Sequence, residues 1–435
     1  MEKYRTEPLK CWKKAKELRE NYYRNYATAH EKGGIRWAGS GWAFDSVPMG
    51  LGEDVYSLTS EPYGAAIASD NKFSLECLEA TEKFGFARDL CAYMRNYWGS
   101  VILNKYAFGG PFPKPDFLWT AHICCSHSKW YQVVSELEGG IPFRSIDASV
   151  GPAPPFGEVT ENKINYISGQ LLDGIEWLQE ITRRKFDDEK FIDAAMNHFR
   201  SSSVWGEIGV LNQAVPAPLD EKSMYSLYAL TMLGGATKEV ADFYEEVREE
   251  VKDRVNRNIA AIATERCRIM SDSQPPWGFL KIFRYLEDYG CVSIGSIYTF
   301  GLTGILVYDD KTQALLPRAI PKRPKTREEA CRALGEWQLY IPLYQQFYSP
   351  DFKSRLMIAL AKQWKANGVI LHLNRGCEGT GLGVMENRLA LQKAGFPVMT
   401  YEGNMGDERE FDEARAIARF DAFMELLGLK KLTSS

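Results

Sequence analysis

The sequence lacks the features of a membrane, secreted or nucleic-acid-binding protein. No apolar run approaches the 18 or more residues of a membrane span, and residues 1–7 (MEKYRTE) lack the apolar core of a signal peptide. Neither sign of charge is in excess, since 53 Lys and Arg face 57 Asp and Glu for a net charge of −4. This balance predicts neither a nucleic-acid surface nor an anionic-membrane surface. We therefore expect a cytoplasmic protein with no nucleic acid and no membrane among its partners.

Several short metal and nucleotide motifs are also missing. No Cys-x-x-Cys pair occurs, which excludes ferredoxin, zinc-finger and thioredoxin motifs, and no Gly-Lys dipeptide occurs, which excludes a Walker loop. Five histidines limit any His-rich metal site. Nine cysteines are an odd number in a chain too long to need disulfides, so free thiols or metal ligands are expected. Any cluster must therefore draw its ligands from distant segments.

Apolar runs alternate with helical patterns in two parts of the chain, and consecutive helices separate these parts. The alternation predicts parallel sheets and an α/β fold. Strands are predicted at residues 117–123, 141–146, 268–270, 291–298, 369–373 and 396–401.

The chain of 435 residues is long enough for two or three domains. Glycine and tryptophan mark residues 33–42 as a loop, an apolar stripe predicts a helix over 73–97, and a proline cluster at 151–157 predicts a sharp stop. We expect an N-terminal helical and loop segment (1–72), a first α/β lobe (73–160), a helical region (161–260) and a second α/β lobe (261–435).

Two cysteines each follow an apolar, strand-like run. Cys124 follows residues 117–123, and Cys377 follows residues 369–373 by a short turn. Ligands of open α/β sheets bind at the carboxyl ends of strands, so the two loops are expected to face one crevice. Cys91 lies on a predicted helix, where a buried core thiol is the ordinary interpretation.

The loop around Cys377 is unusually rich in glycine. Residues 374–383 read NRGCEGTGLG, between the predicted strand and a following helix. Glycines let backbone amides approach a ligand closely, and a nest of amides would tune an anionic iron–sulfur cluster. The spacing does not fit Gly-x-Gly-x-x-Gly, which weakens a dinucleotide interpretation. A tight turn with one buried cysteine remains the alternative.

Neighbouring candidates have ordinary explanations as well. Cys125 directly follows Cys124, and adjacent side chains point in different directions, so a buried structural pair is at least as good an explanation as metal binding. His122 and His372 lie inside apolar runs and are expected to be core histidines.

Five segments in order carry a resemblance to one family, across most of the chain. The sequence resembles the 2-hydroxyacyl-CoA dehydratase and benzoyl-CoA reductase family in residues 90–95 (LCAYMR), 122–129 (HICCSHSK), 268–278 (RIMSDSQPPWG), the Cys377 loop and 401–409 (YEGNMGDER). Each motif is weak alone, whereas their ordered set is fairly specific.

The resemblance implies a fold and a cofactor. The family's fold has two Rossmann-like lobes with helical additions, and a [4Fe–4S] cluster bound by three cysteines lies between them. Carried over residue by residue, the ligands are Cys91, Cys124 and Cys377, with Cys125 as a candidate fourth ligand. The implied surroundings of the cluster are Arg375 and the amides of Gly379, Gly381 and Gly383, and the loop at 275–277 is a candidate wall of the substrate pocket.

The length and the double cysteine look most like the B subunit of ATP-dependent benzoyl-CoA reductase. This implies an iron–sulfur oxidoreductase subunit that passes low-potential electrons to the ring of benzoyl-CoA, giving a cyclohexadiene carbonyl-CoA in anaerobic aromatic catabolism. The implied partners are a homologous cluster-binding subunit, ATPase activator subunits with their own cluster, reduced ferredoxin as upstream donor, and an aromatic acyl-CoA. The alternative is a subunit of a 2-hydroxyacyl-CoA dehydratase, and a non-catalytic scaffold is the alternative from another class.

Overall fold

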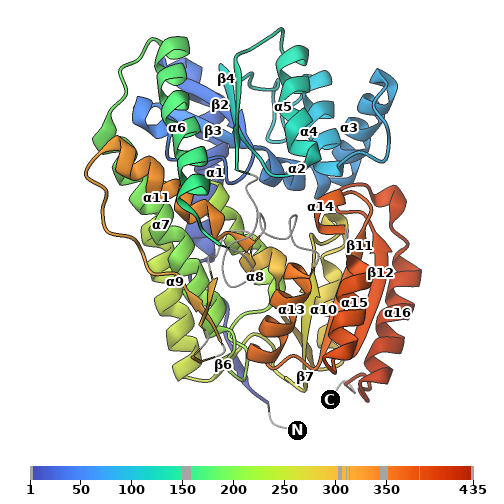
Figure 1. The fold of residues 1–435 in the computed structure, drawn as a ribbon. Coiled ribbons are helices and arrows are strands. Elements are labelled where there is room, and N and C mark those ends of the chain that lie inside the picture. Colours follow the sequence, from blue (N-terminus) through green and yellow to red (C-terminus); the bar gives the residue numbers. More distant parts are fainter. Residues whose placement is uncertain are drawn as a thin grey trace.

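Two parallel sheets form the cores of two lobes. The structure is a computed structural model that describes residues 3–148, 158–301, 306–309, 311–312, 314–342, 351–381 and 383–432. The first sheet has the order β3 (Val55–Thr59), β2 (Ile35–Gly39), β4 (Phe117–His122), β5 (Phe143–Asp147). The second has the order β12 (Val398–Gly403), β11 (Gly368–Asn374), β7 (Cys267–Asp272), β8 (Cys291–Ser296). All neighbouring strands in both sheets are parallel, and the lobes stack one above the other (Figure 1).

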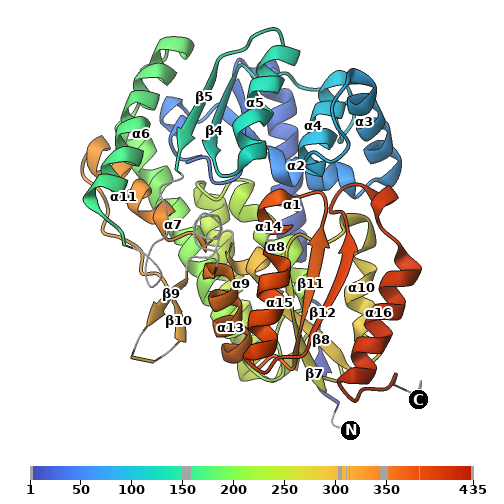
Figure 2. The ribbon, with the colours of Figure 1, turned by 45° about the vertical axis from the view of Figure 1, so that its right-hand side comes forward.

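Helices pack around both sheets, which explains the apolar runs of the strands. Strands of a parallel sheet that are covered on both faces are nearly continuously apolar. Strands β4 and β11 are buried along almost their whole length. The first lobe carries α2 (Ser60–Ala68), α3 (Asn71–Phe84), α4 (Ala92–Ile102) and α5 (Cys125–Leu137), and the second carries α10 (Lys281–Glu287), α13 (Phe352–Gln363), α15 (Val384–Lys393) and α16 (Glu413–Leu426) (Figure 2).

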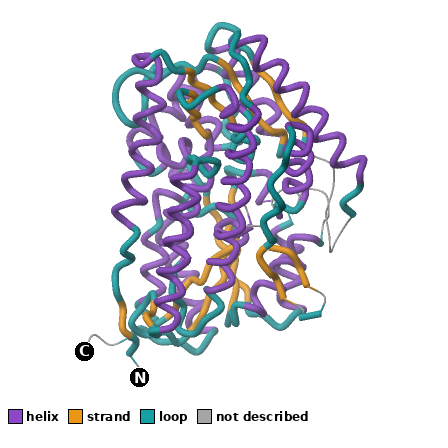
Figure 3. Tube along the Cα trace, turned by 90° about the vertical axis from the view of Figure 1, so that its left-hand side faces the viewer, coloured by secondary structure: helices purple, strands orange, loops and turns teal. Residues whose placement is uncertain are grey.

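A body of long helices runs along one side of both lobes (Figures 1 and 3). It contains α1 (Trp12–Thr28), α6 (Glu161–Thr182), α7 (Asp188–Leu211), α8 (Glu221–Met232), α9 (Lys238–Asn256) and α11 (Arg327–Leu339). Side chains that accept hydrogen bonds from first-turn amides begin five of these helices, namely Thr160, Asp187, Asp220, Thr237 and Thr326. Capping therefore fixes where these helices start.

Short elements complete the described chain. Strand β1 (Arg5–Thr6) pairs in parallel with β6 (Ile259–Ala260), and β9 (Leu306–Asp309) pairs antiparallel with β10 (Ala314–Pro317). The single helical turns are η1 (Ala29–Lys32), η2 (Pro48–Leu51), η3 (Trp277–Phe279), η4 (Ile297–Gly301), η5 (Glu408–Glu410) and α14 (Glu378–Gly381). Within the described ranges, no helix combines the length and apolarity needed to cross a membrane.

The predicted α/β class with parallel sheets is confirmed, and two local predictions are wrong. The segment at 33–42, expected as a loop, contains β2. A Cβ on Gly39 would lie 1.7 Å from the carbonyl oxygen of Trp119, so glycine here serves close approach of β2 to β4 rather than a turn. The helix expected over 73–97 is two helices, α3 and α4, because Gly85 ends α3 in the left-handed conformation (φ 111°). The proline cluster at 151–157 lies outside the described residues.

Candidate functional site

Each sheet has one point where its strand order reverses, and the two reversal points face each other. In the first sheet the reversal lies between β2 and β4, and in the second it lies between β7 and β11. Loops that leave neighbouring strands in opposite directions open a crevice at the strands' carboxyl ends. Cys124 follows β4, Gln274 follows β7 and Cys377 follows β11. Both crevices therefore carry sulfur or amide side chains into the space between the lobes.

A backbone hydrogen bond joins the lobes at the third cysteine. Cys91 immediately precedes α4, and the next amide, that of Ala92, donates to the carbonyl of Gly376 at 3.1 Å. Residue 376 must be glycine, because a Cβ there would lie 2.3 Å from Oδ1 of Asn404. The bond holds the turn at Cys91 against the turn before Cys377.

The three cysteines line one pocket between the lobes. It has an empty volume of about 590 Å³, part of it continuous with solvent. Cys91, Cys124 and Cys377 are each partly exposed, in contrast to five other thiols that are buried elsewhere. The structure therefore brings together the three cysteines that the resemblance implies as ligands.

Polar groups surround two of the sulfurs. Nε2 of Gln274 donates to Sγ of Cys377 at 3.4 Å, and the amide of Thr380 approaches the same sulfur at 3.5 Å. Nδ1 of His127 lies 3.4 Å from Sγ of Cys124. Donors of this kind stabilise thiolates and the sulfurs of a bound cluster.

His127 links Cys124 to a buried carboxylate. Its Nε2 hydrogen-bonds Oε1 of Glu61, whose Oε2 accepts from the amide of Gly41 at 2.7 Å. Burial favours the neutral ring, but Cys124 and Glu61 raise the pKa of His127 well above its usual value. Burial likewise favours the neutral thiol, but the charge and hydrogen bond of His127 lower the pKa of Cys124. The His127 ring thus lies between the Cys124 sulfur and the Glu61 carboxyl group, and both contacts favour its protonated form.

The pKa of Cys91 shifts in the opposite direction from that of Cys124. Burial, followed by the negative charges of Cys377 and Cys124, raises the pKa of the Cys91 thiol, and the amides of Met94 and Tyr93 oppose this only in part. These causes favour the neutral form of the Cys91 thiol.

The donor set suits a cluster better than a single ion. Among the residues that the structure describes, no three His, Cys, Asp or Glu side chains converge closely enough to hold one metal ion. The three thiols instead line a common pocket from three separate elements. A four-iron cluster binds one thiolate at each ligated iron, so its ligands are spread around it. The residues present fit such a group.

The other predicted site residues lie at varying distances from the pocket. Gly379 lines it, the amide of Gly381 donates to the carbonyl of Cys377 at 3.0 Å, and Gly383 begins α15 with a φ of 70°. Arg375 is 60% exposed and pairs with Glu402 at 3.0 Å. Cys125 is exposed as the first residue of α5 and is not among the residues that line the pocket. Leu382, within the glycine-rich loop, lies outside the described residues.

The two histidines predicted as core residues have different surroundings. His372 is buried, donates from Nδ1 to the carbonyl of Gln274 (2.7 Å), and stacks on Tyr401. Burial lowers its pKa to about 4. His122 is less buried and lies 3.2 Å from Oδ1 of Asp147.

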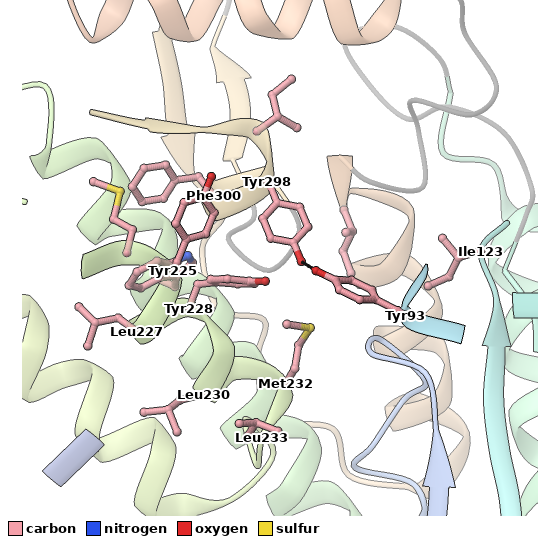
Figure 4. Packing of buried hydrophobic residues seen from close by; sticks show 14 of the residues in the cluster. Tyr93, Ile123, Tyr225, Leu227, Tyr228, Leu230, Met232, Leu233, Tyr298 and Phe300 are labelled. Atoms are coloured by element: carbon pink, nitrogen blue, oxygen red, sulfur yellow. Dashed lines mark hydrogen bonds between the residues drawn. The ribbon is translucent and has the colours of Figure 1, made fainter. Parts of the chain in front are cut away.

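Sequence reasoning missed several pocket residues. Glu61 follows a strand that was not predicted, and nothing in its local sequence separates it from a surface glutamate. Gln274 was noticed only as part of the proline-rich loop, and its amide reaches Cys377 across the sheet. Tyr93 and Tyr298 come from different lobes, and their hydroxyl groups lie 3.2 Å apart at the pocket wall (Figure 4).

Comparison with known proteins gives consistent matches over most of the chain. Residues 42–427 match the family model described as 2-hydroxyglutaryl-CoA dehydratase, D-component. The (R)-2-hydroxyisocaproyl-CoA dehydratase alpha subunit of Clostridioides difficile is 25% identical over 422 residues, which are 95% of each chain. The (R)-phenyllactyl-CoA dehydratase alpha subunit of Clostridium sporogenes is 26% identical over 401 residues, 90% of each chain.

A third relative has a different acyl group in its name. The (R)-2-hydroxyglutaryl-CoA dehydratase subunit alpha of Acidaminococcus fermentans is 26% identical over 321 residues, which are 72% of this chain and 61% of the relative. The matched region of the family includes all three cysteines of the pocket.

Proposed function

Because the chain belongs to the 2-hydroxyglutaryl-CoA dehydratase D-component family, we propose that it is a subunit of an enzyme that removes water from a 2-hydroxyacyl-CoA. The relatives described above are named as alpha subunits of such dehydratases. The observation that carries the proposal is the pocket between the lobes, where three thiols and a Glu61–His127 pair lie together.

The expectation of a benzoyl-CoA reductase subunit is wrong. The relatives are named for hydroxyisocaproyl, phenyllactyl, hydroxyglutaryl and lactoyl thioesters, which match the alternative interpretation. The motifs could not distinguish the reductase from the dehydratase, because the resemblance implies the same lobes and cluster for both activities. The spacing of the cluster ligands is therefore the same in both. The enzyme class accordingly changes from oxidoreductase to lyase, although the proposed chemistry still uses electron transfer.

The proposed cofactor is a [4Fe–4S] cluster bound by Cys91, Cys124 and Cys377. Support comes from the shared pocket and from the donors at two of the sulfurs. When bound, such a cluster supplies single-electron transfer, which makes the hydrogen on C3 of the acyl group acidic enough to remove. Cys125 stays a candidate ligand only if its side chain turns inward.

Residues of this chain account for the proton movements. Dehydration breaks the C2–OH and C3–H bonds, forms a C2=C3 double bond and releases water. The Glu61 carboxyl group and the His127 ring share a hydrogen bond, so one can hold a proton that the other releases. The Gly41 amide fixes Oε2 of Glu61, which keeps the carboxylate oriented at the pocket. We therefore assign proton transfer to this pair.

We propose two kinds of partner. A second, beta-type subunit completes the dehydratase, since the family relatives are named as alpha subunits. An ATP-dependent activator with its own cluster supplies the electron, and the missing Walker loop of this chain fits that division of labour. The family resemblance implies both partners, with reduced ferredoxin upstream of the activator.

The test is a paired measurement of iron and activity on the complex purified without oxygen. Wild type is expected to contain about four irons and four sulfides per chain and to dehydrate a 2-hydroxyacyl-CoA with catalytic amounts of ATP and reductant. Cys377→Ser should lose the activity and about four irons from the complex. Cys331→Ser is the matched control, since Cys331 is buried in α11 away from the pocket lining and should change neither property. Full iron content in Cys377→Ser, or a requirement for stoichiometric reductant, would overturn the proposal.

A further inference from the structure

The pocket wall beside the three cysteines is mainly apolar and aromatic. Its side chains come from both lobes and from the π-helical turn η4, and they include Trp42, Tyr93, Ile123, Trp130, Tyr298 and Met405. Figure 4 shows Tyr93, Ile123 and Tyr298 grouped at this wall. An acyl group placed next to the cysteines would therefore touch rings and aliphatic groups first.

The tyrosine hydroxyls at this wall are already engaged. The hydroxyl of Tyr93 lies 3.2 Å from that of Tyr298 and also accepts from Nε1 of Trp277. Tyr298 packs against Tyr228 with ring centroids 5.3 Å apart. These contacts turn the two hydroxyls toward each other, so a ligand at this wall would contact the tyrosine rings and not their hydroxyls.

The charges at the pocket do not suit a substrate whose acyl side chain ends in a carboxylate. Among the described residues that line it, none is Lys or Arg. The one cationic side chain, His127, already contacts both Glu61 and Cys124. The one carboxyl side chain among the described lining residues, Glu61, is itself hydrogen-bonded to His127 and to the amide of Gly41.

Buried cations near the Cys377 loop are committed to other partners. Nζ of Lys353 lies 2.9 Å from Oδ2 of Asp272 and donates to the carbonyl of Thr380 at 2.8 Å. Arg95 is fully buried and pairs with Asp407 at 3.2 Å. A side-chain carboxylate in the pocket would be desolvated without a counter-ion, which is strongly unfavourable.

We infer that the site accepts 2-hydroxyacyl groups with an apolar side chain, aromatic or branched aliphatic, and rejects those whose side chain ends in a carboxylate. This inference rests on the proposed function and specifies its substrate class. Among the acyl groups in the relatives' names, phenyllactyl and hydroxyisocaproyl fit the wall, whereas hydroxyglutaryl does not.

The test compares three thioesters on the reconstituted complex with its activator. The value of kcat/KM for (R)-phenyllactyl-CoA and (R)-2-hydroxyisocaproyl-CoA should exceed that for (R)-2-hydroxyglutaryl-CoA by at least about 100-fold. Values within tenfold of each other, or a preference for the glutaryl thioester, would overturn the inference and leave the proposed function standing. Failure of all three with a full iron content would overturn the proposed function itself.

Binding provides a readout that is independent of turnover. Trp42 and Trp130 lie in the wall, so quenching of tryptophan fluorescence by 3-phenylpropionyl-CoA should be much stronger than by glutaryl-CoA at equal concentration. Equal quenching by both would contradict the inference.

A pair of variants tests the charge argument directly. Trp42→Arg introduces a cation at a half-buried position of the wall. It should reduce the ratio of kcat/KM for the phenyllactyl thioester to kcat/KM for the glutaryl thioester at least tenfold. Trp42→Leu, the matched control, removes the ring without adding charge. It should leave kcat/KM for the glutaryl thioester as low, relative to the phenyllactyl thioester, as in wild type. If the arginine variant does not fold, the comparison of wild-type kcat/KM values still decides.

Discussion

At the scale of single residues, the candidate site depends on where each cysteine lies relative to a helix start. Cys91 and Cys124 are the residues immediately before α4 and α5, and Cys377 immediately precedes α14. Backbone amides of the first turn favour the thiolates of Cys91 and Cys124, although burial opposes ionisation at both. The same local geometry therefore recurs at sites remote in the sequence.

Gln274 is expected to tune the reduction potential of the bound cluster. Gln274→Ala removes the donor to Sγ of Cys377, and hydrogen bonds to ligand sulfurs favour the more negative, reduced state. A loss of about 1 kcal/mol lowers the potential by roughly 40 mV for a one-electron couple. An EPR-monitored redox titration measures the shift. Gln363→Ala is the control, because Gln363 hydrogen-bonds Leu315 of β10 and does not line the pocket. An unchanged potential in Gln274→Ala would contradict the assignment.

Asp45 is expected to make stability depend on pH. Burial, followed by the charge of Glu61, raises the pKa of Asp45 to about 7, and its buried Oδ1 accepts no hydrogen bond from the described residues. The folded state thus keeps a proton that the unfolded chain has released, so the free energy of unfolding falls as the pH rises from about 4 to about 7.

The variant Asp45→Asn removes this dependence. It should be more stable than wild type at pH 8, with the difference shrinking toward pH 4, as urea denaturation can measure. Asp309→Asn should behave in the opposite way, because hydrogen bonds from Thr312 and nearby amides lower the pKa of Asp309. Equal effects of the two substitutions at pH 8 would rule out the explanation.

The cysteines could be predicted from the sequence, whereas the polar groups around them could not. Cys124 and Cys377 follow apolar runs that must be buried strands, and the resemblance adds Cys91. Glu61 contacts His127, which lies 66 residues away in the sequence, and Gln274 contacts Cys377, which lies 103 residues away. No local pattern encodes such contacts, because they depend on the order of strands within each sheet.

At the scale of secondary-structure elements, strand β2 and helix α4 differ most from the sequence prediction. The glycines in residues 33–42 gave β2 the sequence pattern of a loop. One of them, Gly39, is required where the backbone of β2 approaches β4 at Trp119. Strands β4 and β11 were predictable because both of their faces are covered and their sequences are correspondingly apolar. A strand that achieves close packing through glycine gives the sequence signal of a loop.

Helix α4 is expected to depend on one buried ion pair for its position. Arg95 donates to the carbonyl of Leu90 and pairs with Asp407 after β12, so it ties the turn at Cys91 to the second lobe. Arg95→Met leaves Asp407 partly unpaired in the interior and should lower the free energy of unfolding by about 3 kcal/mol. Iron content of the complex should fall with it, since the position of Cys91 is no longer fixed.

The matched control is Arg332→Met. Arg332 forms an exposed pair with Glu161, and loss of such a pair should cost less than about 1 kcal/mol and leave iron content unchanged. Chemical denaturation and iron analysis of both variants make the comparison. A similar loss of stability in the two would show that burial of the Arg95 pair is unimportant.

At the scale of the whole molecule, the pocket joins two lobes that each have their own sheet. Cys91 and Cys124 come from the first lobe and Cys377 from the second, and the Ala92–Gly376 hydrogen bond crosses between them. A ligand that binds groups on both lobes stabilises the arrangement in which those groups are close. A bound cluster should therefore hold the lobes together as well as carry electrons.

Removal of iron is expected to loosen the contact between the lobes without unfolding either sheet. After anaerobic chelation, amide exchange should accelerate at residues 91–95 and 374–381, where the cysteine turns of the two lobes lose the ligand that they share. Exchange in α6, which contains no pocket residue, should stay unchanged and serves as the internal control. Hydrogen–deuterium exchange followed by mass spectrometry on the complex before and after chelation measures both regions. Acceleration spread evenly over α6 and the cysteine turns would indicate global destabilisation instead, and no acceleration at the turns would mean that the thiols do not hold the iron.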